Sequence, residues 1–107
     1  MPRQPRFTII YAPETIDHLD AIERKHHRLI RKMVKEQLSH TPEQMTRNRK
    51  PLDPPLPFGA TWELRFGPKN RFRVFYEIDS DARAVSVLAV GIKEGNRLFI
   101  GQEEFTP

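Results

Sequence analysis

The chain has 107 residues, which is close to the common size of one domain and enough to build one hydrophobic core. Its 18 Lys and Arg against 14 Asp and Glu give a formal net charge of +4, which permits an anionic partner. The absence of cysteine excludes disulfides and thiolate metal sites and favours a reducing cytoplasm. No apolar run suits a signal peptide or a membrane span, so we expect one soluble domain over residues 1–107.

The N-terminal residues predict a loose end followed by a short strand. Residues 1–6 carry two prolines and two arginines with nothing to pack, so we expect them to be disordered. Residues 7–11 are β-branched or aromatic and have the right length for a strand. Pro13 and Glu14 then supply the proline and the acidic first turn that are typical of a helix start.

Two stretches of helical periodicity follow, over about 13–24 and again from Leu29 to Leu38. Lys25-His26-His27 interrupts the apolar stripe between them, which favours a helical hairpin that ends near Ser39-His40. One long helix is the alternative, because the period could run through His26. We favour the hairpin, since two short amphipathic helices cover a small sheet better than one long rod.

The histidines all fall in this helical part of the chain, and two of them are adjacent. Adjacent residues on a helix do not face each other, and no histidine or acidic partner at four-residue spacing completes a metal site. We therefore expect the histidines on the solvated faces of the helices and no bound metal; they are His18, His26, His27 and His40.

The segment 41–57 contains five prolines and cannot continue a helix. Leu52 and Leu56 give it apolar groups to bury, so we expect it to run extended across the edge of the domain. Its basic cluster, Arg47-Asn48-Arg49-Lys50, has two interpretations. The simpler is a solvated turn, which this segment alone favours; the other is that Arg49 and Lys50 border a groove for phosphate.

The residues from Trp62 to Ile78 predict a β-hairpin with one apolar and one basic face. Successive strand residues point to opposite faces, and Gly67-Pro68-Lys69-Asn70 has the composition of a reversal. Arg65 on the first arm then shares a face with Arg71 and Arg73 on the second. Such a sheet needs helices on one side only and presents guanidinium groups on the other, as a phosphate-binding protein would.

A further strand is predicted over 84–90, and its nearly continuous apolar character suggests a central place in the sheet. We expect Gly91 to end this strand, and residues 92–97 to form a polar loop from which Lys93 and Arg97 approach the basic face. Residues 98–100 then suit a last short strand. The whole order predicts an α+β fold: an N-terminal strand, a helical hairpin, and a mostly antiparallel three- to four-stranded sheet with helices on one face.

Motifs for nucleotide binding, for zinc peptidases and for serine nucleophiles are missing from the sequence. What remains for chemistry is the set of bases on the sheet and its loops. Taken one at a time, these residues are ordinary exposed charges of a sheet surface. Their combination is more informative, because it matches a known family.

The stretches ELRFGPKNRFRVFYEID and VLAVGIKEGNRLFI, preceded by TRNRKPL, resemble the RelE/ParE superfamily of type II toxin–antitoxin toxins. The resemblance spans essentially all of residues 7–105 in the family's element order. RelE-type members are similar in being small, basic, metal-free ribonucleases that cut mRNA in the ribosomal A site, and ParE-type members inhibit DNA gyrase instead. The resemblance therefore implies a cytoplasmic toxin with a cognate antitoxin and no cofactor, and it leaves the target open.

The family's functional residues map onto several positions of this chain. Arg65 matches the arginine that contacts the scissile phosphate in RelE-type enzymes, Arg73 matches the arginine of the next strand, and Lys93 replaces a basic residue after the glycine. Phe99 stands where RelE-type members have a C-terminal tyrosine, so it keeps a stacking surface and loses the hydroxyl. The resemblance thus implies Arg65, Arg73 and Lys93 as catalytic residues; those contacting RNA would be Arg49, Lys50, Arg71, Arg97 and Phe99.

Three functions follow from this resemblance. The first is ribosome-dependent cleavage of mRNA that inhibits translation, in which the arginines stabilise charge on the phosphate while the general acid and base are unassigned. The second is a ParE-like toxin that binds a protein target and has no chemistry of its own. The third is a degenerate member that binds RNA or antitoxin without cutting, which the loss of the tyrosine hydroxyl makes credible.

Overall fold

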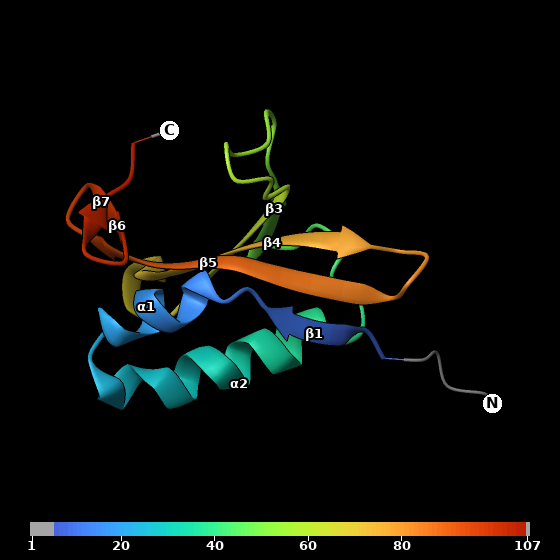
Figure 1. The fold of residues 1–107 in the computed structure, drawn as a ribbon, viewed down its shortest axis with the longest axis horizontal. Helices are drawn as coiled ribbons and strands as arrows, with labels where there is room; N and C mark the ends of the chain where they lie inside the picture. The colour runs from blue at the N-terminus through green and yellow to red at the C-terminus, as the bar shows by residue number, and fades with distance from the viewer. Residues whose placement is uncertain (1–5, 107) are drawn as a thin grey trace.

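The computed structural model describes residues 6–106 and forms one seven-stranded sheet with two helices on one face (Figure 1). Most of the expected loose end at residues 1–6 lies outside the described residues. The expected α+β class, with a mostly antiparallel sheet, is confirmed. The sheet is larger than expected, because short strands form at both of its ends.

The sheet follows the chain order except at its first strand. Five antiparallel ladders connect the later strands, and the N-terminal strand β1 (Thr8–Tyr11) pairs in parallel with β5. Such a parallel pair needs a crossover, which the helical hairpin provides. The remaining strands, in sheet order, are β2 (Arg49–Pro51), β3 (Trp62–Phe66), β4 (Phe72–Asp79), β5 (Ala84–Glu94), β6 (Arg97–Ile100) and β7 (Glu103–Glu104).

The helical hairpin is confirmed as two separate helices, α1 (Glu14–Asp20) and α2 (His27–Leu38), joined through a 3-10 turn at Arg24–His26. The break comes before the basic residues that predicted it, because α1 ends at Asp20. The helix α2 buries one stripe, Ile30, Val34 and Leu38, against the sheet. Its opposite face is charged and exposed, as amphipathic packing requires.

The main core lies between the helices and the predicted apolar face of the central hairpin. Tyr76 is fully buried at its centre, and its hydroxyl donates a hydrogen bond to the carbonyl of Pro42 at 2.9 Å. Burial raises the pKa of this phenol far above its usual value, so the group stays neutral. The other sheet residues of this core are Leu64, Phe66, Phe72, Val74, Val85, Val87 and Val90.

The prediction that Gly91 ends a strand is wrong, because β5 continues to Glu94 and pairs with β4 and β6 on both sides. A Cβ at position 91 would lie 3.0 Å from the carbonyl oxygen of Phe99 and 3.1 Å from the side chain of Leu98. Glycine therefore permits the close approach of β6. The expected polar loop shrinks to a two-residue turn, in which Gly95 has a φ of +63°.

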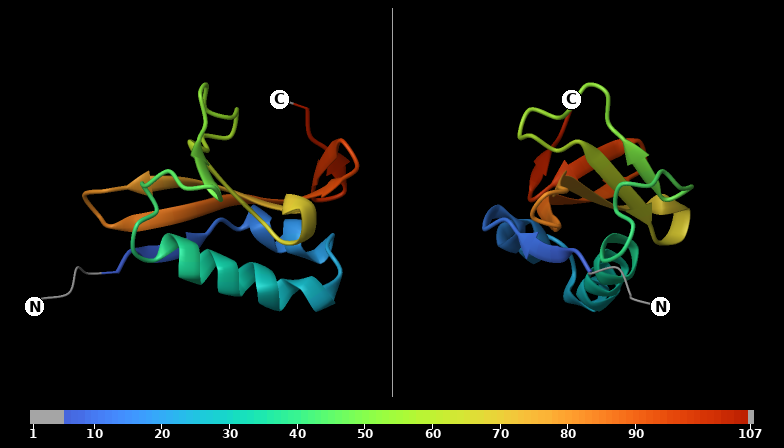
Figure 2. Two further views of the ribbon diagram at one scale, coloured as in Figure 1. Left: turned by 180° about the vertical axis from the view of Figure 1, so that it is seen from behind. Right: turned by 90° about the vertical axis from the view of Figure 1, so that its right-hand side faces the viewer.

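A second, smaller core covers part of the sheet face that we expected to be open. Phe75 is buried there between Ala60 and Ala89. The loop 52–60 and the strands β6 and β7 stand on this side of the sheet, away from the helices (Figure 2). They contribute Leu52, Leu56, Leu98 and Ile100 to this core. The basic surface is thereby confined to one part of the face.

Two of the histidines have structural roles that differ from the expected solvated faces. The strands β1 and β6 pair with the same edge of β5, one after the other, and the N–H of Val90 lies in the gap between the two ladders. His18 fills this gap, since its Nδ1 accepts a hydrogen bond from Val90 N–H at 3.3 Å. His27 Nε2 lies 2.8 Å from the carbonyl oxygen of Ile22 and ties the first residue of α2 to the connection that follows α1.

We expect His18 to weaken the fold at acidic pH. Burial lowers the pKa of His18 below its ordinary value of 6.5, against the opposing effect of Asp17 and Glu14. The neutral ring therefore stabilises the fold above pH 6.5, and this contribution is lost as the pH falls through 6.5 toward the lowered pKa, because the unfolded chain binds the proton more readily. Between pH 7.5 and 5.5, urea unfolding should show a larger loss of the free energy of unfolding for the parent than for His18→Gln. The glutamine amide accepts the same hydrogen bond without titrating. Equal losses would contradict this role.

Candidate functional site

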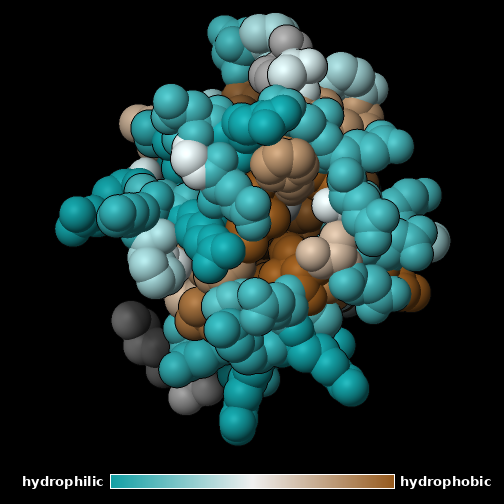
Figure 3. Space-filling model, turned by 90° about the vertical axis from the view of Figure 1, so that its left-hand side faces the viewer, coloured by the Kyte–Doolittle hydropathy of each residue, from teal (hydrophilic) through white to brown (hydrophobic). Residues whose placement is uncertain are grey.

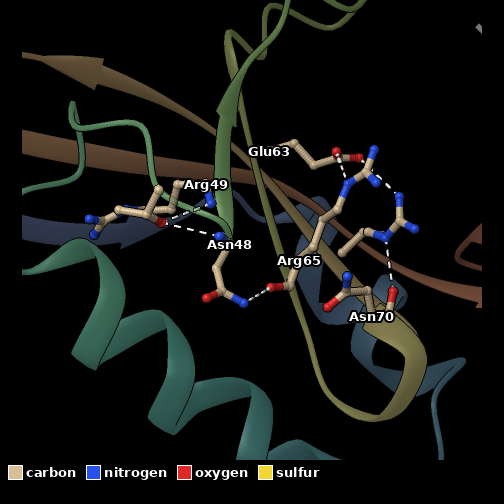
Figure 4. A network of polar contacts seen from close by, with 7 residues as sticks. Asn48, Arg49, Glu63, Arg65 and Asn70 are labelled. Carbon is tan, nitrogen blue, oxygen red and sulfur yellow. Dashed lines mark hydrogen bonds and ion pairs between the residues drawn. The ribbon is translucent and has the colours of Figure 1, made fainter.

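Three charged residues form a compact group on the face of the sheet away from the helices. Arg65 on β3 and Arg73 on β4 stand directly opposite each other, an arrangement that is destabilising for like charges. Glu63 resolves the conflict, because its carboxylate accepts a hydrogen bond from Arg65 Nε at 2.6 Å and one from Arg73 Nη1 at 3.3 Å (Figure 4). We call these three residues the arginine cluster.

The two arginines of the cluster differ in exposure. The side chain of Arg73 is only 9% exposed, that of Glu63 8% and that of Arg65 33%. Arg73 also donates from Nε to the carbonyl of Asn70 at 3.0 Å, and its burial lowers the pKa of its guanidinium, opposed by the Glu63 carboxylate. The terminal nitrogens of Arg65 have no hydrogen-bond partner among residues 6–106. Arg65 is therefore the member that can reach a ligand.

A basic pocket of about 660 Å³ lies beside the arginine cluster, at the end of the sheet where β3 turns into β4 and β5 into β6. Arg71 and Lys93 are joined there by a backbone hydrogen bond of 2.7 Å from Lys93 N–H to the Arg71 carbonyl. Lys69, with a φ of 56°, adds a third cation from the turn before β4. The acidic group at the pocket is Glu94, whose Oε1 lies 3.7 Å from Arg71 Nη2. Three cations against one carboxylate make this pocket attractive to an anion.

Arg49 does not border this surface. It is buried under the sheet, where its guanidinium donates to the carbonyl of Gln37 and lies 3.4 Å from Thr41 Oγ1. Its pairing with Leu64, a core residue, places it on the helix side. Arg49 thus fastens α2 to β2, whereas Arg47 and Lys50 of the same cluster are exposed. The interpretation of the cluster as the border of a phosphate groove, which was the alternative to a solvated turn, does not apply to Arg49, because Arg49 is buried in the short strand β2.

Phe99 and Arg97 also lie apart from the arginine cluster. The register of β6 pairs Phe99 with Ile92, which packs on the main core, whereas Leu98 pairs with Lys93. Because strand residues alternate, β6 presents Leu98 to the side of the arginines and Phe99 to the side of the helices. Arg97 lies 5.6 Å over the Phe99 ring and binds Glu104 at 2.9 Å. At this end of the molecule, apolar side chains gather in the middle and hydrophilic ones surround them (Figure 3).

An apolar groove of about 500 Å³ extends from the arginine side of the sheet to α1 at its edge, and the sequence did not indicate it. Phe58 from the loop 52–60 and Phe105 from the C-terminal segment both line it, and their rings touch edge to face with centres 5.8 Å apart. Its floor includes Ala89 and Leu88 of β5, and its rim carries Glu14, Glu103 and Glu104. The signals in the sequence are Phe58 in a proline-rich apolar loop and Phe105 in the polar C-terminal segment.

The described residues show neither a metal centre nor a membrane segment. Over residues 6–106, no group of three or more His, Asp or Glu side chains is placed to hold a metal ion. The helices of that range are too short or too polar to cross a membrane.

Comparisons with known proteins agree with this architecture. The family model of the ParE toxin of the parDE type II toxin–antitoxin system matches residues 9–96. Among solved structures, the chain resembles one from the RelBE2 toxin–antitoxin complex of Mycobacterium tuberculosis, with a TM-score of 0.66 and 22% identity over 84% of this chain and 100% of that one. No curated protein sequence matches. The chain belongs to the ParE toxin family of type II toxin–antitoxin systems, within the RelE/ParE superfamily.

Proposed function

We propose that this toxin inhibits translation by cutting mRNA on the ribosome. The observation that carries this proposal is the grouping of cations on one face of three adjacent strands: Arg65 on β3, Arg71 before β4 and Lys93 on β5. The pocket beside them is open and positively charged, so an RNA backbone can enter with its phosphates against the sheet. The interpretation of Lys93 as part of the site rests on this placement.

The cleavage follows the chemistry of an RNA backbone that supplies its own nucleophile. The 2′-hydroxyl attacks the adjacent phosphorus, the bond to the 5′-oxygen of the next nucleotide breaks, and a 2′,3′-cyclic phosphate remains. The hydroxyl proton leaves to a base, and the departing oxygen takes up a proton. In this scheme Arg65 donates to the phosphate oxygens as their charge rises, and Arg73 with Glu63 holds Arg65 in position.

A cognate antitoxin is the expected regulator of this activity. The similar chain of the M. tuberculosis structure comes from a toxin–antitoxin complex. An acidic antitoxin segment would be drawn to the basic pocket or to the cationic face of α2, because complementary charge accelerates association. Binding of the neighbouring gene product should suppress both toxicity and RNA binding.

The second candidate is a ParE-like toxin that binds a protein such as DNA gyrase and catalyses nothing. Two observations favour it: Glu63 offsets part of the charge of two arginines, one of them buried, and an apolar groove opens on the same face. Exposed apolar surface with a polar rim is typical of protein-binding sites. Under this function the arginine cluster is a structural element of the sheet.

Expression of the toxin in cells distinguishes the two candidates. Mapping of mRNA 5′ ends after induction should show new ends within translated codons, and plasmid supercoiling should stay unchanged in the first minutes. Intact mRNA together with a loss of negative supercoiling would instead support the gyrase target.

We expect Lys93→Ala to weaken RNA binding in a salt-dependent manner. Each lysine that contacts a phosphate releases about one counterion, so the slope of log affinity against log salt should become shallower by about one unit. Lys32→Ala is the matched control, because Lys32 is exposed on α2 and lies near Glu36 rather than on the basic face. Titration of each variant with purified ribosomes at several salt concentrations measures the two slopes. Equal slopes for the two variants would remove Lys93 from the site.

A further inference from the structure

The apolar groove has two walls that hydrogen bonds hold in place. One wall is the loop 52–60, which is closed by a bond of 3.0 Å from Leu56 N–H to the carbonyl of Ala60. The other wall is the C-terminal segment, in which Phe105 N–H donates to the carbonyl of Leu98 at 2.8 Å. Both rise from the side of the sheet away from the helices (Figure 2). A groove that is already formed loses little conformational freedom when a ligand binds.

The floor of the groove comes from a bulge in β5. Phe75 pairs with Ala89, and the next residue of β4 pairs with Val87. Leu88 is therefore the extra residue of the bulge, and it lines the groove beside Ala89. Bulges redirect side chains and are common beside binding sites. The sheet thus departs from regular pairing where it forms the groove floor.

Phe58 gives the groove an exposed aromatic surface. Its ring meets those of Phe75 and Phe105 edge to face, with centres 6.2 Å and 5.8 Å away, and the residue is still 38% exposed. The volume of about 500 Å³ lies within the range of ligand pockets. Aromatic residues in a hollow are common anchors for the apolar side chains of a partner. The groove is therefore able to receive such side chains.

The border of the groove is acidic, although the chain as a whole carries a net charge of +4. A second hollow of about 460 Å³ adjoins the groove and shares His18, Ile100 and Glu103 with it. The carboxylates of the two hollows are Glu14, Asp17, Asp20, Glu103 and Glu104. Among residues 6–106, no lysine or arginine lines either hollow, and of these carboxylates only Glu104 forms an ion pair, with Arg97. This end of the molecule therefore attracts positive charge.

The acidic border decides which occupant suits the groove. RNA would bring its phosphates against these carboxylates, and an acidic antitoxin segment would meet the same repulsion. A basic protein segment with an apolar side chain finds both complementary charge and an apolar floor. Its place would be close to the arginine cluster, because Phe75 follows Arg73 by two residues on the same face of β4, about 7 Å along the strand. The occupant would therefore lie beside the RNA that the cluster binds.

We propose that the groove docks a basic segment of a ribosomal protein. An apolar side chain of this segment lies against Phe58 and Leu88, and neighbouring lysines or arginines pair with Glu14 and Glu103. This inference rests on the proposed function, because it is on the ribosome that the toxin would meet proteins made basic by their binding of RNA. The contact adds affinity for the ribosome and takes no part in the cleavage itself.

Reversal of one rim charge should have opposite effects on an occupied and on an empty groove. Glu103→Lys should weaken binding to purified ribosomes by about three- to tenfold, because an attraction to the docked segment becomes a repulsion. Glu23→Lys is the matched control, since Glu23 is also exposed but lines neither hollow. It should bind as tightly as the parent or slightly more tightly, because an added cation favours the anionic ribosome. A Glu103→Lys toxin that binds no more weakly than Glu23→Lys would overturn the proposal.

Cross-linking identifies the occupant. Benzoylphenylalanine in place of Phe58 keeps an aromatic ring in the groove and bonds to carbon atoms near it under ultraviolet light. With purified ribosomes programmed with mRNA, the product should contain a ribosomal protein, joined at a segment in which an apolar residue adjoins lysine or arginine. Glu103→Lys should reduce this product and Glu23→Lys should not. Should the label join mRNA or ribosomal RNA instead, the groove is an RNA site and the proposal is wrong.

The remaining outcomes separate the docking groove from the proposed function. A toxin that cuts mRNA on ribosomes yet gives no protein product from the label would overturn the docking groove alone. A toxin that neither binds ribosomes nor cuts mRNA would overturn both. A product of two toxin chains, lost in Glu103→Lys, would assign the groove to a second copy of this chain. Where the label at Phe58 lowers the melting temperature, the same label in place of Phe105 repeats the test, because both rings line the groove.

Discussion

Glu63→Ala should lower the free energy of unfolding by about 3–5 kcal/mol, the cost of removing one partner from a buried ion pair. The carboxylate lies between two arginines that stand directly opposite each other, and its loss leaves Arg73 buried beside the like charge of Arg65. For a domain of this size each kcal/mol corresponds to about 4–8 °C, so the melting temperature should fall by more than about 10 °C. Urea unfolding and a thermal scan measure the two quantities.

Two further variants test whether the loss of stability comes from the buried carboxylate of Glu63. Glu77→Ala removes an exposed glutamate from the neighbouring strand β4 and should change stability by less than about 0.5 kcal/mol. Glu63→Gln keeps an acceptor for the arginines but not the charge, so its stability should lie between those of Glu63→Ala and Glu77→Ala. If Glu63→Ala unfolds at the same urea concentration as Glu77→Ala, the carboxylate does not hold the cluster together.

Arg65→Ala should reduce the single-turnover rate of mRNA cleavage on programmed ribosomes by about 100- to 1,000-fold, the usual cost of losing one electrostatic donor to a developing anion. Ribosome binding should change far less, because stabilisation that appears mainly in the transition state affects the rate and not the affinity. Arg65 is suited to this experiment because its side chain is a third exposed and its terminal nitrogens are available to a ligand.

The control is Arg28→Ala, which removes an exposed arginine from α2, on the other side of the sheet. It should cut at the parental rate. Arg73→Ala is expected to lose activity as well, though partly through stability, since Arg73 is buried against Glu63. A folded Arg65→Ala that cuts like the parent would remove the catalytic role of the cluster and favour the protein-binding function.

Several elements could be predicted from sequence because local periodicity decides them. The alternation from Trp62 to Ile78 separates a core face from a charged face in any antiparallel pair, and the observed register keeps Leu64 opposite Val74 and Arg65 opposite Arg73. The helical stripe of α2 has the same basis, since spacing alone places Ile30 and Val34 on one side. These parts of the fold follow from the chain itself.

Local periodicity could not predict which residues from distant parts of the chain contact each other. Gly91 has the appearance of a strand end, and only the approach of Phe99 and Leu98 reveals why a glycine is needed inside β5. Arg49 appears to be a surface cation until its contact with Gln37 shows that it is buried under the sheet. Phe99 is separated from the arginines by its register with Ile92. A shift of one residue would have placed it on the other face.

The sequence by itself determined the α+β class and the shared face of Arg65 and Arg73, and it favoured a helical hairpin over one long helix, because each depends on the period of residues close together in the chain. Only the tertiary structure decided that Glu63 neutralises part of their charge, that Arg73 is buried while Arg65 is not, and that β1 keeps a free edge. These features depend on which segments distant in the chain come together. That is set by packing of the whole core, which no local pattern encodes.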